Sequence, residues 1–366
     1  MPAHASPWIA SRATDIAMVV IPFIAGTIAL FLVTAFQIEE PLWVYMLAFV
    51  AFDVAHVWAT AYLTYLDKKR FSRRRALYTW PIPIGFLAAF ILHVSSPTAY
   101  WTLLSYFAIF HFAKQQYGFV AIYKALHRER SRLDYWLDKT TLWVGALGPV
   151  LLWHAAPHGQ FEWFGSGEDF LIRLPPAWSS ALQMGMILVA MTWSVRQVWL
   201  WRTAGHWNPG KTMWMVASWA SWLLGVKYSQ HLLVSAAYIN FIHGLPFLIL
   251  VYRRLASQRG TTALEGAPLV AWLSAPGRGW AFYAFVFGIG LIEEIFWDGM
   301  VWQTYMPTLF TFAPAPTTGW QLSFWIALLS TPQIVHYFLD GFLWKMNAHN
   351  DDLMRTFGVR SQGQKA

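Results

Sequence analysis

The chain has 366 residues, of which 57% are apolar, 18% aromatic and 12% charged. Soluble domains are usually about a quarter charged, so this composition excludes an ordinary soluble globular protein. Cysteine is absent, which excludes disulfide scaffolds, thiolate-ligated clusters and cysteine nucleophiles. The formal charge of +8 comes from basic residues in short segments between apolar runs. This pattern is typical of a polytopic membrane protein and argues against a nucleic-acid-binding face.

Apolar runs that are long enough to cross a bilayer recur along the chain. A bilayer core of roughly 30 Å takes about 20 helical residues to cross. The candidate spans are 16–36, 43–66, 77–93, 98–123, 136–153, 180–201, 212–228, 231–252, 280–298 and 319–344. We therefore expect an all-α transmembrane bundle of about ten spans, which forms a single integral-membrane domain over residues 1–366.

The basic residues predict the orientation of these spans. Clusters of Lys and Arg follow the second, fourth, sixth, eighth and tenth runs, whereas the segments between them carry few basic residues. Cytoplasmic loops carry the excess of Lys and Arg in membrane proteins. This alternation places both termini in the cytoplasm and requires an even number of spans. The short loops and the strong charge bias fit a bacterial inner membrane best.

Four histidines lie well inside four different apolar runs: His56, His111, His243 and His336. An ionisable side chain inside a membrane helix costs about 2.5–3.5 kcal/mol on insertion scales, so each of the four is a functional candidate. In the expected orientation, the first three lie near the bilayer midplane and His336 lies nearer the inner face. The similar depth predicts that they act together.

Each of these histidines has a polar companion three or four residues away, and therefore on the same face of its helix. The companions are Asp53, Gln115, Asn240 and Asp340. Imidazoles with carboxylate or amide neighbours suit a metal that takes nitrogen and oxygen ligands. We therefore expect a metal centre held by the four histidines. Iron, as one or two ions, is the preferred metal, and zinc, manganese and copper are the alternatives.

Three carboxylates are candidate catalytic groups. Asp53 and Asp340 are expected to ligate the metal or to orient the histidine rings, and Glu294 is a further candidate near the end of the ninth run. Gln115, Asn240 and Lys114 are candidates for a supporting shell around the ligands. A single histidine in a membrane helix is often only an interhelical hydrogen-bonding group, so a structural role is the alternative for each of them.

Three short phrases resemble a known family: Phe110-His111-Phe112, Ile242-His243-Gly244-Leu245-Pro246 and Val335-His336-Tyr337. They look like the isolated histidines of the bacterial carotene-cleaving oxygenases related to bacteriorhodopsin-associated proteins. The resemblance implies an all-helical membrane enzyme in which histidines from separate helices hold iron and a carotenoid is split with dioxygen. A more distant resemblance is to membrane lipid hydroxylases and desaturases, although their dense histidine boxes are missing from these helices.

Together these features predict an integral-membrane, metal-dependent oxidoreductase that acts with dioxygen on a lipid, isoprenoid or carotenoid. An apolar cavity would select such a substrate and keep reactive oxygen species from water. The expected partners are this hydrophobic substrate, membrane lipids and an external electron donor, with no nucleic acid. A proton-coupled transporter, with the same Asp and His residues as a protonation relay, is the main alternative. Haem binding by pairs of the histidines is another.

Overall fold

The structure is a computed structural model that describes residues 7–37, 46–156, 173–228, 231–260, 264–303, 318–345 and 350–357. Within these ranges all regular structure is helical, which confirms the prediction of an all-α protein. The chain divides into two compact units. Unit 1 comprises 1–38, 105–243 and 357–360, and unit 2 comprises 39–104, 244–356 and 361–366. The divisions fall inside two helices, α7 (Pro97–Leu126) and α11 (Leu232–Ala256).

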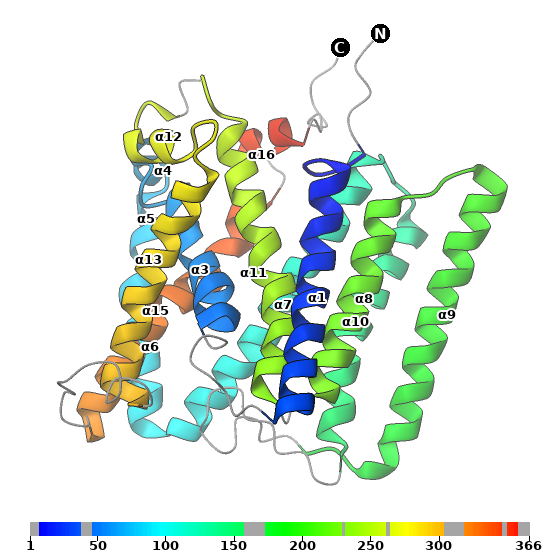
Figure 1. Cartoon of the computed structure of the whole chain (residues 1–366), viewed down its shortest axis with the longest axis horizontal. Coiled ribbons are helices and arrows are strands. Elements are labelled where there is room, and N and C mark those ends of the chain that lie inside the picture. The colour runs from blue at the N-terminus through cyan, green and yellow to red at the C-terminus, as the bar shows by residue number, and fades with distance from the viewer. Residues whose placement is uncertain are drawn as a thin grey trace. The chain divides into compact units, whose positions relative to one another are not determined.

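Unit 1 is built around α8, which packs against α9 and α10 (Figure 1). Its own helices are α1 (Arg12–Phe36), α8 (Arg132–His154), a 3₁₀ turn η3 (Pro176–Trp178), α9 (Ser179–Ala204) and α10 (Pro209–Lys227). Side-chain oxygens cap the N-termini of α1, α8 and α10, because Ser11, Ser131 and Asn208 each accept a backbone N–H three residues ahead. These local signals fix where the helices begin.

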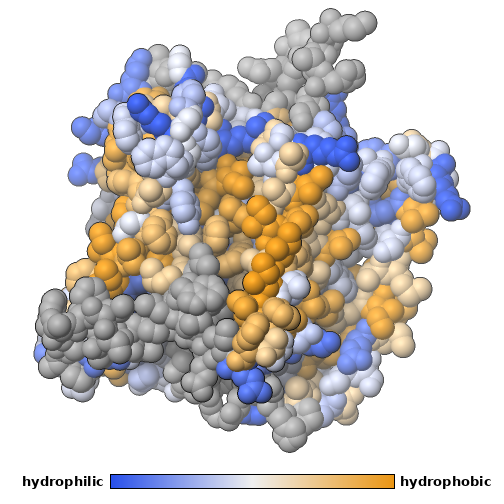
Figure 2. Space-filling view, in the orientation of Figure 1, coloured by the Kyte–Doolittle hydropathy of each residue, from blue (hydrophilic) through white to orange (hydrophobic). Residues whose placement is uncertain are grey.

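The surface of α1 is suited to contact with lipid. Large apolar side chains of α1 are exposed, among them Ile21, Ile24, Ile28 and Phe31. Figure 2 shows hydrophobic residues along α1, with hydrophilic residues gathered near its N-terminal end. Exposed apolar side chains at this density suit a lipid environment and would be a liability in water.

Unit 2 packs its long helices around the segment that holds His56. Its elements are η1 (Met46–Val54), α3 (Ala55–Ala59), η2 (Thr60–Leu63), α4 (Lys68–Arg73), α5 (Arg75–Thr79), α6 (Pro81–Ser95), α12 (Pro268–Leu273), α13 (Gly279–Trp297), η5 (Asp298–Trp302), α15 (Gly319–Leu343) and α16 (Asp351–Thr356). α15 lies along α6 and touches α3, and α13 packs against η1 and α3. This packing places α3 at the centre of the unit.

Within the described ranges, five helical stretches are long and apolar enough to cross a membrane: Arg12–Phe36, Arg75–Ser95, Val234–Ala256, Gly279–Trp302 and Gly319–Leu343. They support a membrane protein. The number of ten spans and the cytoplasmic side of the termini stay predictions. The expected break between the seventh and eighth runs is present, since α10 ends at Lys227 and α11 begins at Leu232.

The second predicted span departs from a regular helix. Its first residues, 43–45, lie outside the described ranges, and the remainder changes from a π-helix (η1) to a short α-helix (α3) and then to a 3₁₀-helix (η2). Gly244 of α11 explains the tight packing there, since a Cβ at this position would lie 2.3 Å from the carbonyl oxygen of Phe52. π-helical turns occur frequently at functional sites.

Several basic residues of the predicted loops are buried in ion pairs. Lys211 is fully buried and its Nζ lies 2.8 Å from Glu129 Oε2 and 3.5 Å from Asp138 Oδ2. Lys124 also pairs with Asp138. From the sequence, these lysines indicate only which side of the membrane their loops lie on. Their ion pairs could not be predicted, because the carboxylates that they contact are not adjacent to them in the sequence.

A second ion-pair network ties the C-terminal helix to unit 2. Asp352 of α16 accepts two hydrogen bonds from the guanidinium of Arg254, at 2.7 and 3.0 Å, and one from Arg70 at 2.7 Å. Burial acts to raise the pKa of the Asp352 carboxyl, but the charges of Arg254 and Arg70 outweigh it and hold this pKa well below its usual value. The basic run around Arg70 therefore has a structural partner as well as its predicted topological role.

Candidate metal centre

His56 and His336 form a buried pair in unit 2. His56 is the second residue of α3 and His336 lies in the second half of α15. Their Nε2 atoms lie 3.1 Å apart, and each residue is 1% exposed. The Nδ1 atom of His336 lies 2.7 Å from the hydroxyl of Thr60. A hydroxyl at this nitrogen fixes the plane of the ring and directs Nε2 toward His56.

The Nδ1 side of His56 meets two oxygen acceptors. Its Nδ1 lies 3.3 Å from the carbonyl oxygen of Phe52 and 3.5 Å from Asp53 Oδ1. On α15, the carboxylate of Asp340 lies 3.8 Å from His336 Nε2. The predicted companions Asp53 and Asp340 are therefore both next to their histidines. An acceptor at Nδ1 favours the tautomer in which His56 Nε2 carries a lone pair.

His111 and His243 form the corresponding pair in unit 1. Their ring centroids lie 5.0 Å apart with the planes at 81°, and the ring of Phe112 stacks on His243 at 3.8 Å. Gln115, one turn after His111, donates from Nε2 to the backbone carbonyl of His243 at 2.7 Å. Gln115 thus links the two helices that carry this pair, α7 and α11.

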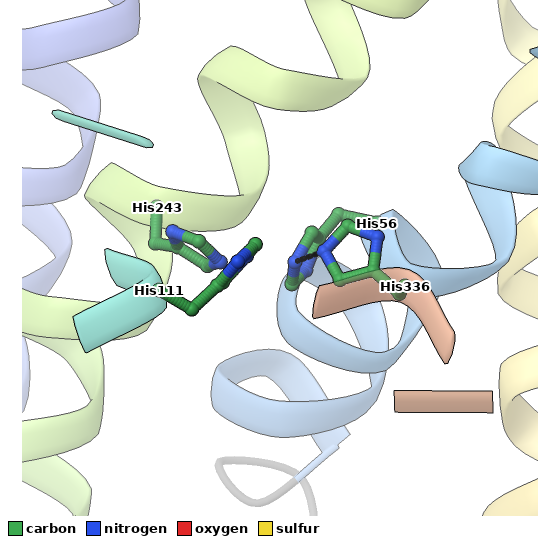
Figure 3. A group of neighbouring side chains, drawn as sticks. All are labelled: His56, His111, His243 and His336. Atoms are coloured by element: carbon green, nitrogen blue, oxygen red, sulfur yellow. Dashed lines mark hydrogen bonds between the residues drawn. The ribbon is translucent and has the colours of Figure 1, made fainter. Parts of the chain in front are cut away.

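The four histidines form one group (Figure 3). Each offers one ring nitrogen, and these four nitrogens lie within 4.8 Å of one another. None of the four residues is more than 4% exposed. Four such imidazoles that share so small a space could hold a metal ion, whose identity this geometry leaves open.

The three remaining predicted site residues lie on α7, α11 and α13. Asn240 is buried on α11, one turn before His243. Glu294 is buried on α13. Lys114, by contrast, is exposed, and its Nζ lies 5.9 Å from the centre of the Phe110 ring. The exposed lysine therefore does not join the buried histidines, because its long side chain extends away from them along the helix surface.

Two groups near the histidines were missed in the sequence. Thr60 follows His56 by four residues, so the spacing that identified Asp340 also marks it. Threonine is common in membrane helices, so this spacing alone does not distinguish its hydroxyl from a structural one. Trp58 was missed as well, and it donates to Glu293 Oε2 at 2.5 Å. A contact across 235 residues leaves no local pattern in the sequence.

In the part of the chain that the structure describes, two further buried histidines lie outside this group. The Nδ1 of His93 lies 2.9 Å from Ser323 Oγ, and Nε2 of His154 lies 3.2 Å from the hydroxyl of Tyr106. Both residues are no more than 6% exposed. Burial alone therefore does not distinguish the four grouped histidines, whereas their mutual distances do.

Comparisons with known proteins add no assignment to this site. No protein-family model, curated protein or solved structure matches the chain. The resemblance of the three histidine phrases to carotene-cleaving oxygenases stays a prediction. The chemistry of the site therefore follows from its own residues.

Proposed function

We propose that the chain is an integral-membrane oxidoreductase whose four grouped histidines hold iron and which oxidises a lipid or isoprenoid with dioxygen. The observation that carries this proposal is the group of four buried imidazole nitrogens within 4.8 Å of one another. Buried polar groups in a membrane helix are expensive, and a ligand set that binds a metal offsets that cost. A purely structural histidine needs only one hydrogen-bonding partner.

The donor set fits a metal ion. Two nitrogens that bind one metal at about 2.0–2.1 Å lie about 2.9–3.4 Å apart at bond angles between square and tetrahedral. The 3.1 Å separation of the Nε2 atoms of His56 and His336 falls within this range. The grouped histidines offer nitrogen donors, Asp340 offers a carboxylate oxygen beside them, and the chain has no cysteine thiolate. Such donors suit iron, zinc, manganese or copper.

The residues around the histidines would orient the ligands. Thr60 at Nδ1 of His336, and Asp53 with the Phe52 carbonyl at Nδ1 of His56, hold the rings so that both Nε2 atoms face the same point. Such partners also raise the basicity of a ligand. Asp340 is close enough to His336 to supply an oxygen ligand or to accept a proton from it.

Aromatic rings around the ligands would keep the site dry. The ring of Phe247 lies 5.5 Å from His56 and 5.4 Å from His336, and Phe112 covers one face of His243. When bound, iron supplies redox chemistry with dioxygen. The aromatic surroundings would exclude water from the reaction and favour an apolar substrate. These features support the choice of a lipid or isoprenoid over a polar substrate.

The proposal is tested by the metal content of the detergent-purified protein, grown in metal-replete medium and measured by mass spectrometry. We expect about one or two metal ions per chain in the wild type. The variants His111→Ala and His336→Ala should lose this metal. The matched control is His93→Ala, which removes a buried histidine outside the group and should retain it.

Two results would contradict the metal centre. One is a wild-type protein that binds no metal under these conditions, and the other is equal metal content in His336→Ala and His93→Ala. Either result favours the proton-coupled transporter, in which Asp53 and His56 or His336 and Asp340 exchange protons. Flux driven by a pH gradient in liposomes would then test that alternative. A Soret band in the absorption spectrum would instead identify haem.

A further inference from the structure

An apolar groove of about 760 Å³ lies between α8 and α9 of unit 1, apart from the histidines. Its walls are mostly apolar side chains of the two helices, and Trp136, Lys139, Gly148, Ala181, Gly185 and Met186 are among the residues that line it. Pockets for small molecules measure about 300–1,000 Å³, so the groove is large enough for a ligand. Its lining requires that this ligand be mainly apolar.

Small residues on α9 keep part of the groove open. A Cβ at Gly185 would meet no other atom within 4 Å, so the space beside this residue is unfilled. Ala181, one turn earlier, is exposed. At Gly148 of α8 a Cβ would instead lie 2.7 Å from Met186 Sδ, which shows that the two helices are in contact beside the opening. The groove is therefore a gap between two helices that touch elsewhere.

One end of the groove is positively charged. The Nζ of Lys139 lies 5.2 Å from the centre of the Trp136 ring and 6.0 Å from that of Tyr135, so its side chain extends toward the start of α8. Arg132 lies seven residues before Lys139 and thus on the same helix face. Among the described residues, no carboxylate forms an ion pair with Lys139. Its charge is available to an external anion.

We propose that this groove binds an anionic phospholipid, with an acyl chain against the apolar walls and the phosphate at Lys139. An ammonium beside tryptophan and tyrosine rings at a helix end is the arrangement expected at the level of lipid headgroups. The exposed Arg128 and Arg130 precede this end of α8 and add to its positive charge. A lipid without net charge would fit the apolar walls, but its headgroup would gain less from the positive charge at this end of the groove. The proposal is independent of the metal centre.

The test is native mass spectrometry of the delipidated full-length protein with phosphatidylglycerol or phosphatidylcholine of identical acyl chains. The wild type should bind phosphatidylglycerol about fivefold more tightly, the effect expected of one lysine near a membrane surface. Lys139→Gln should weaken phosphatidylglycerol binding more than phosphatidylcholine binding and so reduce this preference. Gly185→Phe should weaken the binding of both lipids, because the ring occupies the space of the acyl chain.

Matched controls address folding and general charge. Lys227→Gln removes another lysine that lies over an aromatic ring, and Gly288→Phe fills another open glycine position on α13. Both should bind the two lipids like the wild type. If Gly185→Phe fails to fold, Ala181→Phe fills the same groove from an exposed position. Wild-type binding in the groove-filling variant, equal affinity of the wild type for both lipids, or an unchanged preference in Lys139→Gln would each overturn the proposal.

Discussion

Thr60 is a single side chain on which the orientation of a proposed ligand depends. Its hydroxyl lies 2.7 Å from Nδ1 of His336, while the opposite ring nitrogen lies 3.1 Å from His56. Replacing the groups that orient metal ligands typically lowers metal affinity by about 10- to 100-fold. Thr60→Val keeps the shape but removes the hydroxyl, so we expect a loss of this size. Competition with a chelator measures it.

The conservative change at the same position is the control. Thr60→Ser restores the hydroxyl without the methyl group and should recover most of the affinity. If Thr60→Val and Thr60→Ser bind the metal equally well, the hydroxyl does not orient the ring. Equal thermal stability of the two variants would show that packing is not the cause of a difference.

At the scale of elements, the close contact between α11 and η1 determines where His56 lies. Gly244 faces the carbonyl of Phe52, and a Cβ there would approach this oxygen to 2.3 Å. A backbone oxygen cannot move aside, so Gly244→Ala should push the segments apart. Overpacking of this kind costs about 1–3 kcal/mol. We expect a lower melting temperature in detergent and weaker metal binding.

The matched control for this prediction is Gly288→Ala on α13. A Cβ at Gly288 would meet no atom within 4 Å, and alanine favours the helix more than glycine does. The melting temperature of Gly288→Ala should therefore equal or exceed that of the wild type. A Gly244→Ala variant as stable as Gly288→Ala would show that the contact is not tight.

At the scale of the whole molecule, the ion pair between Arg254 of α11 and Asp352 holds α16 against the rest of unit 2. Arg254 is fully buried, so Asp352→Asn leaves a buried guanidinium without its charge partner. Breaking a buried pair in this way costs about 3–5 kcal/mol. Thermal unfolding should show this loss. A melting temperature like that of the wild type would exclude the pair as a structural tie.

The pH dependence of this tie follows from the direction of the Asp352 pKa. Since the pKa is lower in the folded protein than in the unfolded chain, the stabilisation is present above the unfolded pKa, about 3.9, and is lost as the pH falls toward the folded value. The difference in melting temperature between wild type and Asp352→Asn should therefore be constant from neutral pH to about pH 5 and shrink only in stronger acid. A difference that shrinks near pH 6 would contradict this assignment.

The number and direction of the spans can be tested by single cysteines, because the natural chain has none. With ten spans and both termini in the cytoplasm, Ser72→Cys and Gly205→Cys should be shielded from a membrane-impermeant maleimide in intact cells. Arg173→Cys should react. All three should react in opened membranes, and the wild type should stay unlabelled. Labelling of residue 72 and residue 173 from the same side would refute the predicted alternation.

The sequence allowed prediction of the features that depend on hydropathy. A histidine within an apolar run is easily recognised as a functional candidate, because an imidazole in lipid is energetically costly. The helical spacing of Asp53 from His56 and of Asp340 from His336 then predicts that each carboxylate lies next to its histidine. Local spacing carries no information about distant contacts. Arg254 and Asp352 are 98 residues apart, and Gly244 of α11 lies against the carbonyl oxygen of Phe52 in η1, far from it in the sequence. Such features become visible only in the fold.

The attachment of α9 to α8 is uneven along its length. In the second half of α9, Trp193 donates to Asp138 at 2.8 Å and Arg196 pairs with Asp134 at 2.8 and 3.2 Å. Its first half borders the groove, where the facing side chains are mainly apolar and the polar contact to the end of α8 is a long hydrogen bond, 3.5 Å, from Ser179 Oγ to the carbonyl oxygen of Ala155. α9 is thus held to α8 by strong polar contacts in its second half and by weaker contacts in its first half. Deuterium exchange in the first half of α9 should therefore exceed that in the second.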